Sequence, residues 1–251
     1  MTLAIRTENL TKIYKRKHLF KTVVSRGVED LGLAIEAGEI FGLLGLNGSG
    51  KTTTIKLMLG LLRPTKGGVF ILGEPVPTVN TLRKVGFLPE VPYFYKYLTA
   101  FEILKFYGEL SGIDRLNERV LETLETVGMA EVRNKRLSEF SKGMLQRIGI
   151  AQSLLHDPLI LIYDEPTSGL DPLAVQEMRN LLLRLKEKGK TIFLSSHMIS
   201  EVEKVCDRVG ILVGGRLVKV MKQEEWKGGG KLESEFVAAA EGSAEFGRIK
   251  I

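Results

Sequence analysis

Alternating apolar and polar positions near the start of the chain predict strands that are buried on one face. The alternation covers residues 3–8 and 31–36, and it matches the two-residue period with which strand side chains change faces. A continuous apolar run, typical of a strand covered on both faces, occupies residues 159–163, and buried strands are also predicted over residues 39–44 and 191–195. The pattern therefore predicts a sheet with fully buried central strands.

Segments whose apolar residues have helical spacing alternate with these strands. This spacing predicts helices over residues 53–62 and 173–188. A short strand is predicted over 69–72, and two glycines between apolar runs predict a hairpin over 209–220. The chain is therefore expected to belong to the α/β class.

The middle of the chain, residues 98–152, has a mainly helical pattern. Thr99 and Glu102 have the spacing of a capping box at the start of a helix. Two amphipathic stretches follow, the first broken at Gly112 and the second closed by Gly128. This pattern predicts a helical subdomain inserted into an α/β core.

A glycine-rich loop lies between the predicted strand 39–44 and the next helix. It fits G-x-x-x-x-G-K-[ST], the phosphate-binding P-loop, in the strand and helix context that the motif requires. Glycines let the backbone approach a phosphate closely, and the N–H groups of a helix start form an anion site. Lys51 is expected to contact the β- and γ-phosphates, and the Thr52 hydroxyl to hold Mg²⁺. The candidate loop residues are Gly45, Leu46, Asn47, Gly48, Ser49, Gly50, Lys51, Thr52 and Thr53.

A chance match is the alternative explanation of this motif. By average residue usage, such a match arises in roughly one chain of this size in a hundred. The flanking strand and helix make a chance match rarer still.

Two further segments carry chemistry that complements a triphosphate. Asp164 and Glu165 follow the buried strand 159–163; an Asp there can hold Mg²⁺, and the next carboxylate can polarise a water aimed at the γ-phosphate. Ser141 and Gly143 open a predicted helix, which makes a second anion site.

The order of these motifs resembles that of the ATP-binding cassette (ABC) ATPases, the nucleotide-binding subunits of ABC transporters, over about residues 2–222. Residues 45–52 resemble their Walker A loop, 161–166 their Walker B strand with the catalytic glutamate, and 141–147 their signature segment, usually Ser-Gly-Gly-x-x-Gln-Arg. Residues 168–171 match the D-loop and 195–197 the switch histidine. The resemblance implies ATP and Mg²⁺ as cofactors. It also implies that Tyr14 stacks on adenine, that Glu165 and His197 act in catalysis, and that Asp171 acts across a dimer.

The resemblance also implies a division of the chain. A P-loop core with an antiparallel β subdomain is expected over residues 1–88 and 157–222. The helical subdomain, which carries the signature segment, is expected over 89–156, and 223–251 form a short tail with little periodicity.

Two positions depart from the usual family pattern. Glu90 stands where the family has a glutamine that reaches towards Mg²⁺, and Lys142 replaces the second signature residue, usually glycine. Both variants resemble the branch that serves two-component exporters of the ABC-2 type. Glu90 is a candidate metal ligand that adds negative charge near the γ-phosphate. Lys142 is long enough to approach a phosphate or to project into solvent.

Composition limits the cellular location and the kinds of partner expected for the chain. The 251 residues are 44% apolar, without an apolar run near the ~18–20 residues of a membrane span, and the start lacks a signal-peptide pattern. Cys206 is the single cysteine, which suits a reducing cytosol. The net charge of +6 invites an anionic partner. Because no nucleic-acid-binding motif accompanies the basic cluster near the start, we expect no nucleic-acid partner and a solvated basic surface.

These observations predict an ATPase that drives transport, by resemblance export, through a separate transmembrane permease. The resemblance implies two copies stacked head to tail, each ATP lying between the P-loop of one and Ser141, Lys142 and Gly143 of the other. The expected location is the cytoplasmic face of the cell membrane. Two alternatives are a cassette ATPase acting on ribosomes or DNA, and a nucleotide-binding regulatory module without turnover.

Several candidate residues also have a plain structural interpretation. Tyr14 could pack on the sheet, His197 could be a core histidine, and Asp171 could cap a helix. Four aromatic residues could belong to the core, or they could form an exposed docking surface for a partner helix. They are Tyr93, Phe94, Tyr95 and Tyr97.

Overall fold

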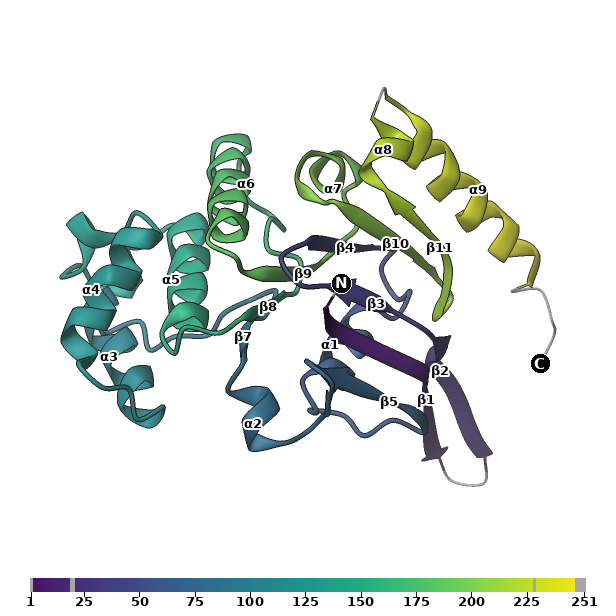
Figure 1. Cartoon of the computed structure of the whole chain (residues 1–251), viewed down its shortest axis with the longest axis horizontal. Coiled ribbons are helices and arrows are strands. Elements are labelled where there is room, and N and C mark those ends of the chain that lie inside the picture. The colour runs from purple at the N-terminus through teal and green to yellow at the C-terminus, as the bar shows by residue number, and fades with distance from the viewer. Residues whose placement is uncertain (1, 19–20, 228, 247–251) are drawn as a thin grey trace. The chain divides into compact units, whose positions relative to one another are not determined.

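The computed structural model describes residues 2–18, 21–227 and 229–246. The chain divides into two compact units, one of residues 1–82 and 193–251 and the other of residues 83–192. Their secondary structure is shown in Figure 1.

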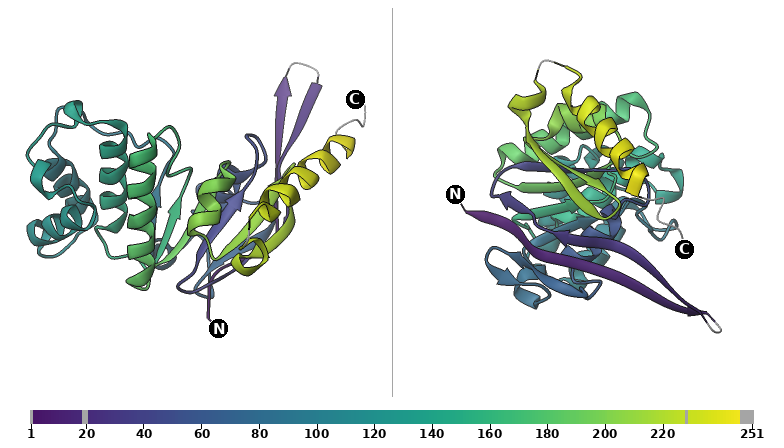
Figure 2. Two further views of the ribbon diagram at one scale, coloured as in Figure 1. Left: turned by 90° about the horizontal axis from the view of Figure 1, so that it is seen from above. Right: turned by 90° about the vertical axis from the view of Figure 1, so that its right-hand side faces the viewer.

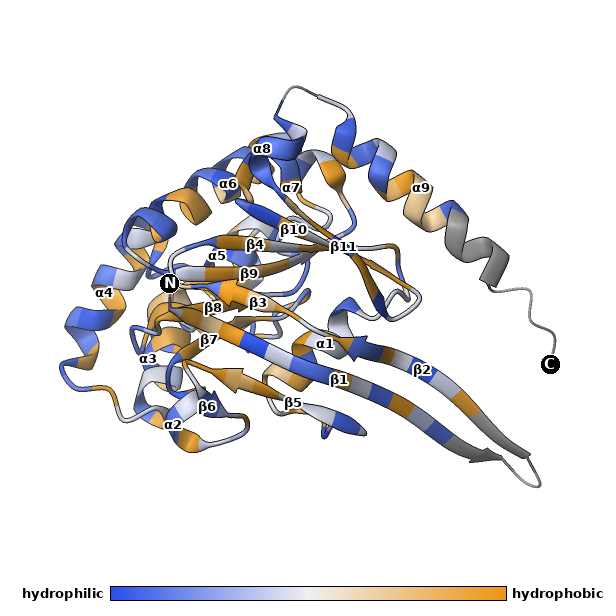
Figure 3. Cartoon of the chain, turned by 45° about the vertical axis from the view of Figure 1, so that its right-hand side comes forward, coloured by the Kyte–Doolittle hydropathy of each residue, from blue (hydrophilic) through white to orange (hydrophobic). Residues whose placement is uncertain are grey.

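The first unit contains an antiparallel sheet built on the long strand β1 (Leu3–His18). Its strand order is β2-β1-β5-β6, with β3 also paired to β1. The alternating hydropathy of β1 is visible as alternating bands in Figure 3. The bounds of the other strands are β2 Lys21–Leu31, β3 Ala34–Glu36, β5 Lys66–Ile71 and β6 Glu74–Pro75.

The predicted strand over residues 31–36 is interrupted, which corrects the sequence analysis. Leu31 ends β2 and Ala34 begins β3, although both strands pair with β1. The Thr7 hydroxyl causes the break: it donates to the Leu31 carbonyl and accepts from the Leu33 N–H, each at 2.8 Å. A side chain thus takes the place of ladder hydrogen bonds at this point.

A second set of strands in the first unit has the order β11-β10-β4-β9. Strand β4 (Ile40–Leu44) is buried throughout, pairs in parallel with β10 (Arg208–Val213) and leads to helix α1 (Lys51–Met58). The predicted hairpin is present, because β10 pairs antiparallel with β11 (Arg216–Lys222). The rings of Phe41 and Phe193 stack at 6.1 Å in the core. The other elements are α2 Val79–Leu82, α7 Ile199–Val205 and β9 Thr191–Ser196, whose first two residues are counted with the second unit.

The C-terminal segment is regular, contrary to the expected irregular tail. Helices α8 (Gln223–Trp226) and α9 (Lys231–Phe246) follow β11. Trp226, Leu232 and Phe236 are buried, and Lys219 pairs with Glu235 at 2.7 Å. The four-residue spacing of Leu232 and Phe236 is the pattern that could have indicated this helix. Residues 247–251 lie outside the described part.

The second unit combines two parallel strands with a group of helices. Strand β7 (Val85–Leu88) pairs with β8 (Ile160–Tyr163), so their carboxyl ends lie side by side. Both bonds of the predicted capping box at Thr99 are present. The helices are α3 Ala100–Leu110, α4 Leu116–Thr126, η1 Ala130–Val132, η2 Leu137–Glu139, α5 Lys142–Leu154 and α6 Pro172–Glu187.

The division into units differs from the predicted bounds of the helical subdomain. The second unit takes in β7, β8 and α6, whereas the sequence predicted residues 89–156 for the helical insert. The predicted bounds stay a prediction. Within the described residues, no helix is both long enough and apolar enough to cross a membrane.

Candidate functional site

The glycine-rich loop connects β4 to α1 in the first unit. Gly48 and Gly50 have φ angles of 82° and 110°, a region that favours glycine. A Cβ atom at Gly45 would come within 2.3 Å of the Ser49 Oγ and 2.6 Å of the Leu212 carbonyl oxygen. The loop conformation therefore depends on its glycines.

The loop presents positive charge and an unused hydroxyl. Lys51 is buried, and its Nζ donates to the carbonyl oxygens of Gly45 at 2.7 Å and Leu46 at 3.3 Å. The Ser49 Oγ is buried without a hydrogen-bond partner among the described residues. Helix α1 has neither a side-chain cap nor an acidic residue in its first turn. A phosphate would satisfy these donors, so the residues present fit an anionic ligand.

Neighbouring segments of the first unit fix this loop. The Gly45 N–H donates to the Ser196 carbonyl at 3.1 Å, and the Gly215 N–H donates to the Ser49 carbonyl at 2.9 Å. His197 directly follows Ser196 at the end of β9 and is exposed. The core interpretation of His197 is therefore wrong, and the histidine lies next in sequence to a residue that bonds the loop.

Tyr14 lies beside the first turn of α1. Its hydroxyl is 3.3 Å from the Thr53 Oγ1, and a Cβ at Gly27 would come within 2.8 Å of both the Tyr14 ring and the Thr53 methyl group. The Lys12 Nζ is 5.5 Å from the centre of the ring. The half-buried ring is thus next to the loop, where a base attached to a bound phosphate chain could stack on it.

The second unit holds the three candidate carboxylates at the ends of two neighbouring strands. Asp164 and Glu165 are buried and follow β8, and the Asp164 N–H donates to the Leu88 carbonyl at the end of β7. Glu90, two residues beyond Leu88, is exposed. Glu165 has a φ of 49°, a conformation that costs a non-glycine residue of order 1–3 kcal/mol and that clusters at functional sites.

The described residues include no group of three or more His, Cys, Asp or Glu side chains that could hold a metal ion. Mg²⁺ usually keeps several waters and substrate phosphates as ligands, so it needs few protein ligands. The exposed Thr52 hydroxyl and the Asp164 carboxylate are oxygen donors of the type that this ion prefers. In their chemistry, these residues fit the predicted role.

Ser141 and Asp171 begin two helices of the second unit. The Ser141 Oγ accepts from the Met144 N–H at 3.3 Å, and an Asp171 oxygen accepts from the Ala174 N–H at 2.9 Å. The predicted capping role of Asp171 is therefore confirmed. A Cβ at Gly143 would come within 3.3 Å of the Ala174 Cβ, so glycine at this position lets the two helix starts approach.

Lys142 is exposed, in line with its predicted projection into solvent, but its ammonium group also contacts the protein. A Cβ placed on Gly169 would lie 2.3 Å from the Lys142 Nζ, so the ammonium group sits against the backbone of Gly169, whose φ is 65°. The second residue of the signature segment thus contacts the D-loop segment of its own unit.

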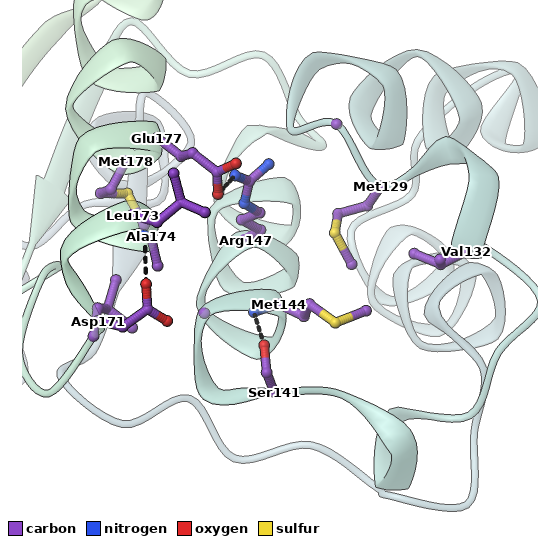
Figure 4. Close-up of a pocket in the computed structure, with 13 residues that line it drawn as sticks. Met129, Val132, Ser141, Met144, Arg147, Asp171, Leu173, Ala174, Glu177 and Met178 are labelled. Atoms are coloured by element: carbon purple, nitrogen blue, oxygen red, sulfur yellow. Dashed lines mark hydrogen bonds and ion pairs between the residues drawn. The ribbon is translucent and has the colours of Figure 1, made fainter.

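A pocket of about 330 Å³ opens beside Ser141 between α5, α6 and residues 128–132, as Figure 4 shows. Arg147 forms an ion pair with Glu177 on one side, and it donates to the Val127 carbonyl at 3.0 Å. Sequence reasoning missed most of this lining, because its members come from three separate segments. The lining residues are Gly128, Met129, Val132, Ser141, Gly143, Met144, Arg147, Leu170, Asp171, Leu173, Ala174, Glu177 and Met178.

The aromatic cluster after Glu90 is largely exposed. Tyr93, Tyr95 and Tyr97 expose 86%, 53% and 68% of their surface, so a core role for these three is wrong. Tyr95 lies 5.8 Å from Tyr97 and 6.1 Å from Phe106, measured between ring centres. We call Tyr93, Tyr95, Tyr97 and Phe106 the aromatic surface.

Comparisons with known proteins agree with this architecture. A family model described as ABC transporter matches residues 28–168. An uncharacterized ABC transporter ATP-binding protein of Synechocystis is 44% identical over 218 residues, which cover 85% of this chain and 61% of that protein. The bacitracin transport ATP-binding protein BcrA of Bacillus licheniformis is 44% identical over 222 residues, covering 87% of this chain and 70% of BcrA.

A solved structure of an ATP-binding cassette is also similar to this chain. The dimeric ATP-binding cassette MJ0796, in a post-hydrolysis state with ADP and Pi, superposes with a TM-score of 0.77 at 27% identity, covering 87% of this chain and 98% of that one. The chain belongs to the ABC transporter family. It spans 61% of the length of its Synechocystis relative.

Proposed function

We propose that this chain binds ATP with Mg²⁺ and hydrolyses it to drive transport through a separate transmembrane permease. The geometry of the loop between β4 and α1 carries the proposal. Its buried ammonium, its Ser49 hydroxyl, which has no partner among the described residues, and its uncapped helix start together suit a chain of phosphates. Family membership supports nucleotide use as the activity of this loop.

The proposed roles follow the chemistry of each residue. The N–H groups at the start of α1, Lys51 and Ser49 bind the β- and γ-phosphates, and Tyr14 supports the adenine. Thr52 and Asp164 supply oxygen ligands to Mg²⁺, which when bound neutralises charge on the phosphates. Glu90 is assigned a more distant contact with the metal, because it is exposed beyond the end of β7.

Glu165 is the proposed base that orients and deprotonates the attacking water, and His197 is proposed to hydrogen-bond the γ-phosphate or that water. The buried carboxylate and its left-handed backbone support this assignment for Glu165. Backbone strain of this kind clusters at active sites.

We also propose that two copies of the chain pack head to tail. Ser141, Lys142 and Gly143 of one copy then face the nucleotide of the other, with Asp171 near the boundary. The dimeric state of MJ0796 supports this arrangement. The exposed position of Ser141 at the start of α5 leaves its hydroxyl accessible to a second chain.

The proposed permease binds at the aromatic surface. Tyrosine and phenylalanine are enriched in protein interfaces, and these rings contact one another while remaining exposed. With this assignment, the proposed location of the chain is the cytoplasmic face of the membrane. The resemblance of Glu90 and Lys142 to the ABC-2 exporter branch supports export as the direction, and bacitracin transport by BcrA is compatible with it.

ATP turnover by Glu165→Gln tests the proposal. Loss of the base should lower hydrolysis by roughly 10²–10⁴-fold, the usual contribution of a general base, while ATP affinity measured by calorimetry stays within about twofold. Glu118→Gln is the control, because Glu118 is exposed on α4 and lies outside the candidate site. Near-normal turnover in Glu165→Gln would exclude the assigned role.

A further inference from the structure

Helices α5 and α6 begin next to each other in the second unit. Figures 1 and 2 both show the two helices side by side. A Cβ atom on Gly143 would lie 3.3 Å from the Ala174 Cβ and 4.0 Å from the Leu170 Cδ2. Helix α5 carries the signature segment, and α6 follows the D-loop segment, residues 168–171. The start of α5 is therefore packed against the D-loop segment of its own chain.

The Lys142 side chain lies along this D-loop segment. Measured from the position that a Cβ atom would take on Gly169, the Lys142 Nζ is 2.3 Å away, its Cε 3.5 Å and its Cδ 3.8 Å. Three consecutive atoms thus follow the backbone at Gly169, although Lys142 is exposed. Gly169 has a φ of 65°, so glycine both permits this turn and leaves the space that the ammonium group fills.

Helix stability does not explain a lysine at this position. Lys142 is the first residue of α5, and a positive charge is unfavourable at the N-terminal end of a helix, where the helix dipole is itself positive. Glycine, the usual family residue here, would add no such charge. What the lysine adds to this helix start is the contact with the D-loop segment.

Short-range hydrogen bonds connect the D-loop segment to the proposed catalytic base. The Ser168 N–H donates to the Glu165 carbonyl at 3.0 Å. The Leu170 N–H donates to the Thr167 carbonyl at 3.3 Å. Two overlapping turns therefore join Glu165 to Leu170, and Glu165 itself has a φ of 49°. A shift of Gly169 within so short a segment moves the backbone that carries the Glu165 carboxylate.

We propose that Lys142 is a positioning residue, which acts on catalysis through the D-loop segment of its own chain. By lying along Gly169, it holds the two turns in one conformation, and the turns fix the orientation of the Glu165 carboxylate. In this arrangement the backbone at the start of α5 faces the nucleotide of the other copy, and the Lys142 ammonium group does not bind that nucleotide. The inference rests on the proposed function, because it needs Glu165 to act as the base.

Amide hydrogen exchange, followed by mass spectrometry, tests the structural part without any turnover. In Lys142→Gly, exchange in residues 165–171 should become about 10-fold faster, because the turns lose the side chain that lies along them. Peptides from α3 should exchange as in the wild type. Lys188→Gly is the matched control, since Lys188 is an exposed lysine at the opposite end of α6, and it should leave exchange in residues 165–171 unchanged.

Steady-state ATPase kinetics test the functional part. Lys142→Gly should lower kcat by roughly 10- to 100-fold, since a misplacement of about 1 Å can cost 10²-fold. KM for ATP should stay within about twofold, because no contact with the nucleotide is lost. Lys142→Arg keeps an aliphatic stem with a cationic head and should retain kcat to within about threefold. Lys188→Gly should have the kinetics of the wild type.

A phosphate contact by the ammonium group would give the opposite pattern. Lys142→Gly would then raise KM, while kcat at saturating ATP and exchange in residues 165–171 stayed unchanged. That pattern, or an unchanged kcat in Lys142→Gly beside the expected loss in Glu165→Gln, would overturn the inference. Near-normal turnover in Glu165→Gln would count against the proposed function, and the exchange measurement, which does not depend on turnover, keeps the two failures apart.

Discussion

Helices α1 and α3 begin in opposite ways. At α3, the Glu102 N–H donates to the Thr99 Oγ1 at 3.2 Å, and the Thr99 N–H donates to the Glu102 carboxylate at 2.8 Å. At α1 the preceding residue is Gly50, with a φ of 110° and no side chain to accept a bond. The start of α3 is capped by its own side chains, whereas the start of α1 is left uncapped.

The difference shows how one backbone element serves two purposes. The first N–H groups of any helix lack an intrahelical partner. Where the chain supplies a capping oxygen, those donors contribute to stability; where it supplies glycine, they stay available to a ligand and attract an anion. The start of α5 lies between the two, because Ser141 caps at 3.3 Å and is also exposed.

The largest expected effect comes from removing the charge at the open helix start. In Lys51→Ala, ATP affinity should fall about 100-fold or more, since hydrogen bonds to charged groups contribute roughly 1.5–3 kcal/mol each. Lys56→Ala, on the exposed side of the same helix, is the matched control and should bind normally. Isothermal titration calorimetry measures both, and equal affinities would show that α1 is not a phosphate site.

A smaller effect is expected on stability when the glycines of the loop gain a side chain. In Gly50→Ala, the new Cβ would lie 2.4 Å from the Gly27 carbonyl oxygen and the left-handed backbone would be strained, so unfolding free energy should fall by about 3 kcal/mol. Gly48→Ala has the same kind of φ but no atom within 4 Å of its Cβ.

The control Gly48→Ala should therefore lower the unfolding free energy only by the strain of a left-handed backbone at alanine, roughly 1–2 kcal/mol. Urea unfolding followed by circular dichroism measures both variants. If Gly48→Ala proved as costly as Gly50→Ala, close packing against Gly27 would have no part in holding the loop.

The smallest effect is expected at the closed helix start. Thr99→Ala removes one of the two capping bonds and should lower the unfolding free energy by about 1 kcal/mol, with ATP affinity unchanged. Thr126→Ala is the control, because Thr126 is the last residue of helix α4 and caps no helix start. A change in ATP affinity in Thr99→Ala would contradict the separation of structural from ligand-binding helix starts.

Local sequence was sufficient wherever the interacting groups are close along the chain. The P-loop follows from glycines at fixed spacing after a buried apolar run, and the capping box of α3 and the cap at Asp171 each join residues three apart. Such contacts depend on backbone geometry over a single turn, so spacing alone predicts them.

The tertiary structure decided what depends on distant partners. The break after Leu31 arises from the hydroxyl of Thr7, 24 residues away; α9 is ordered by packing at Leu232 and Phe236; and Tyr14 meets the loop because Gly27 has no Cβ. No local pattern encodes these contacts, because each requires strands or helices far apart in sequence to come together first. The sequence therefore determined which chemistry the chain carries, and the fold determined which side chains that chemistry can reach.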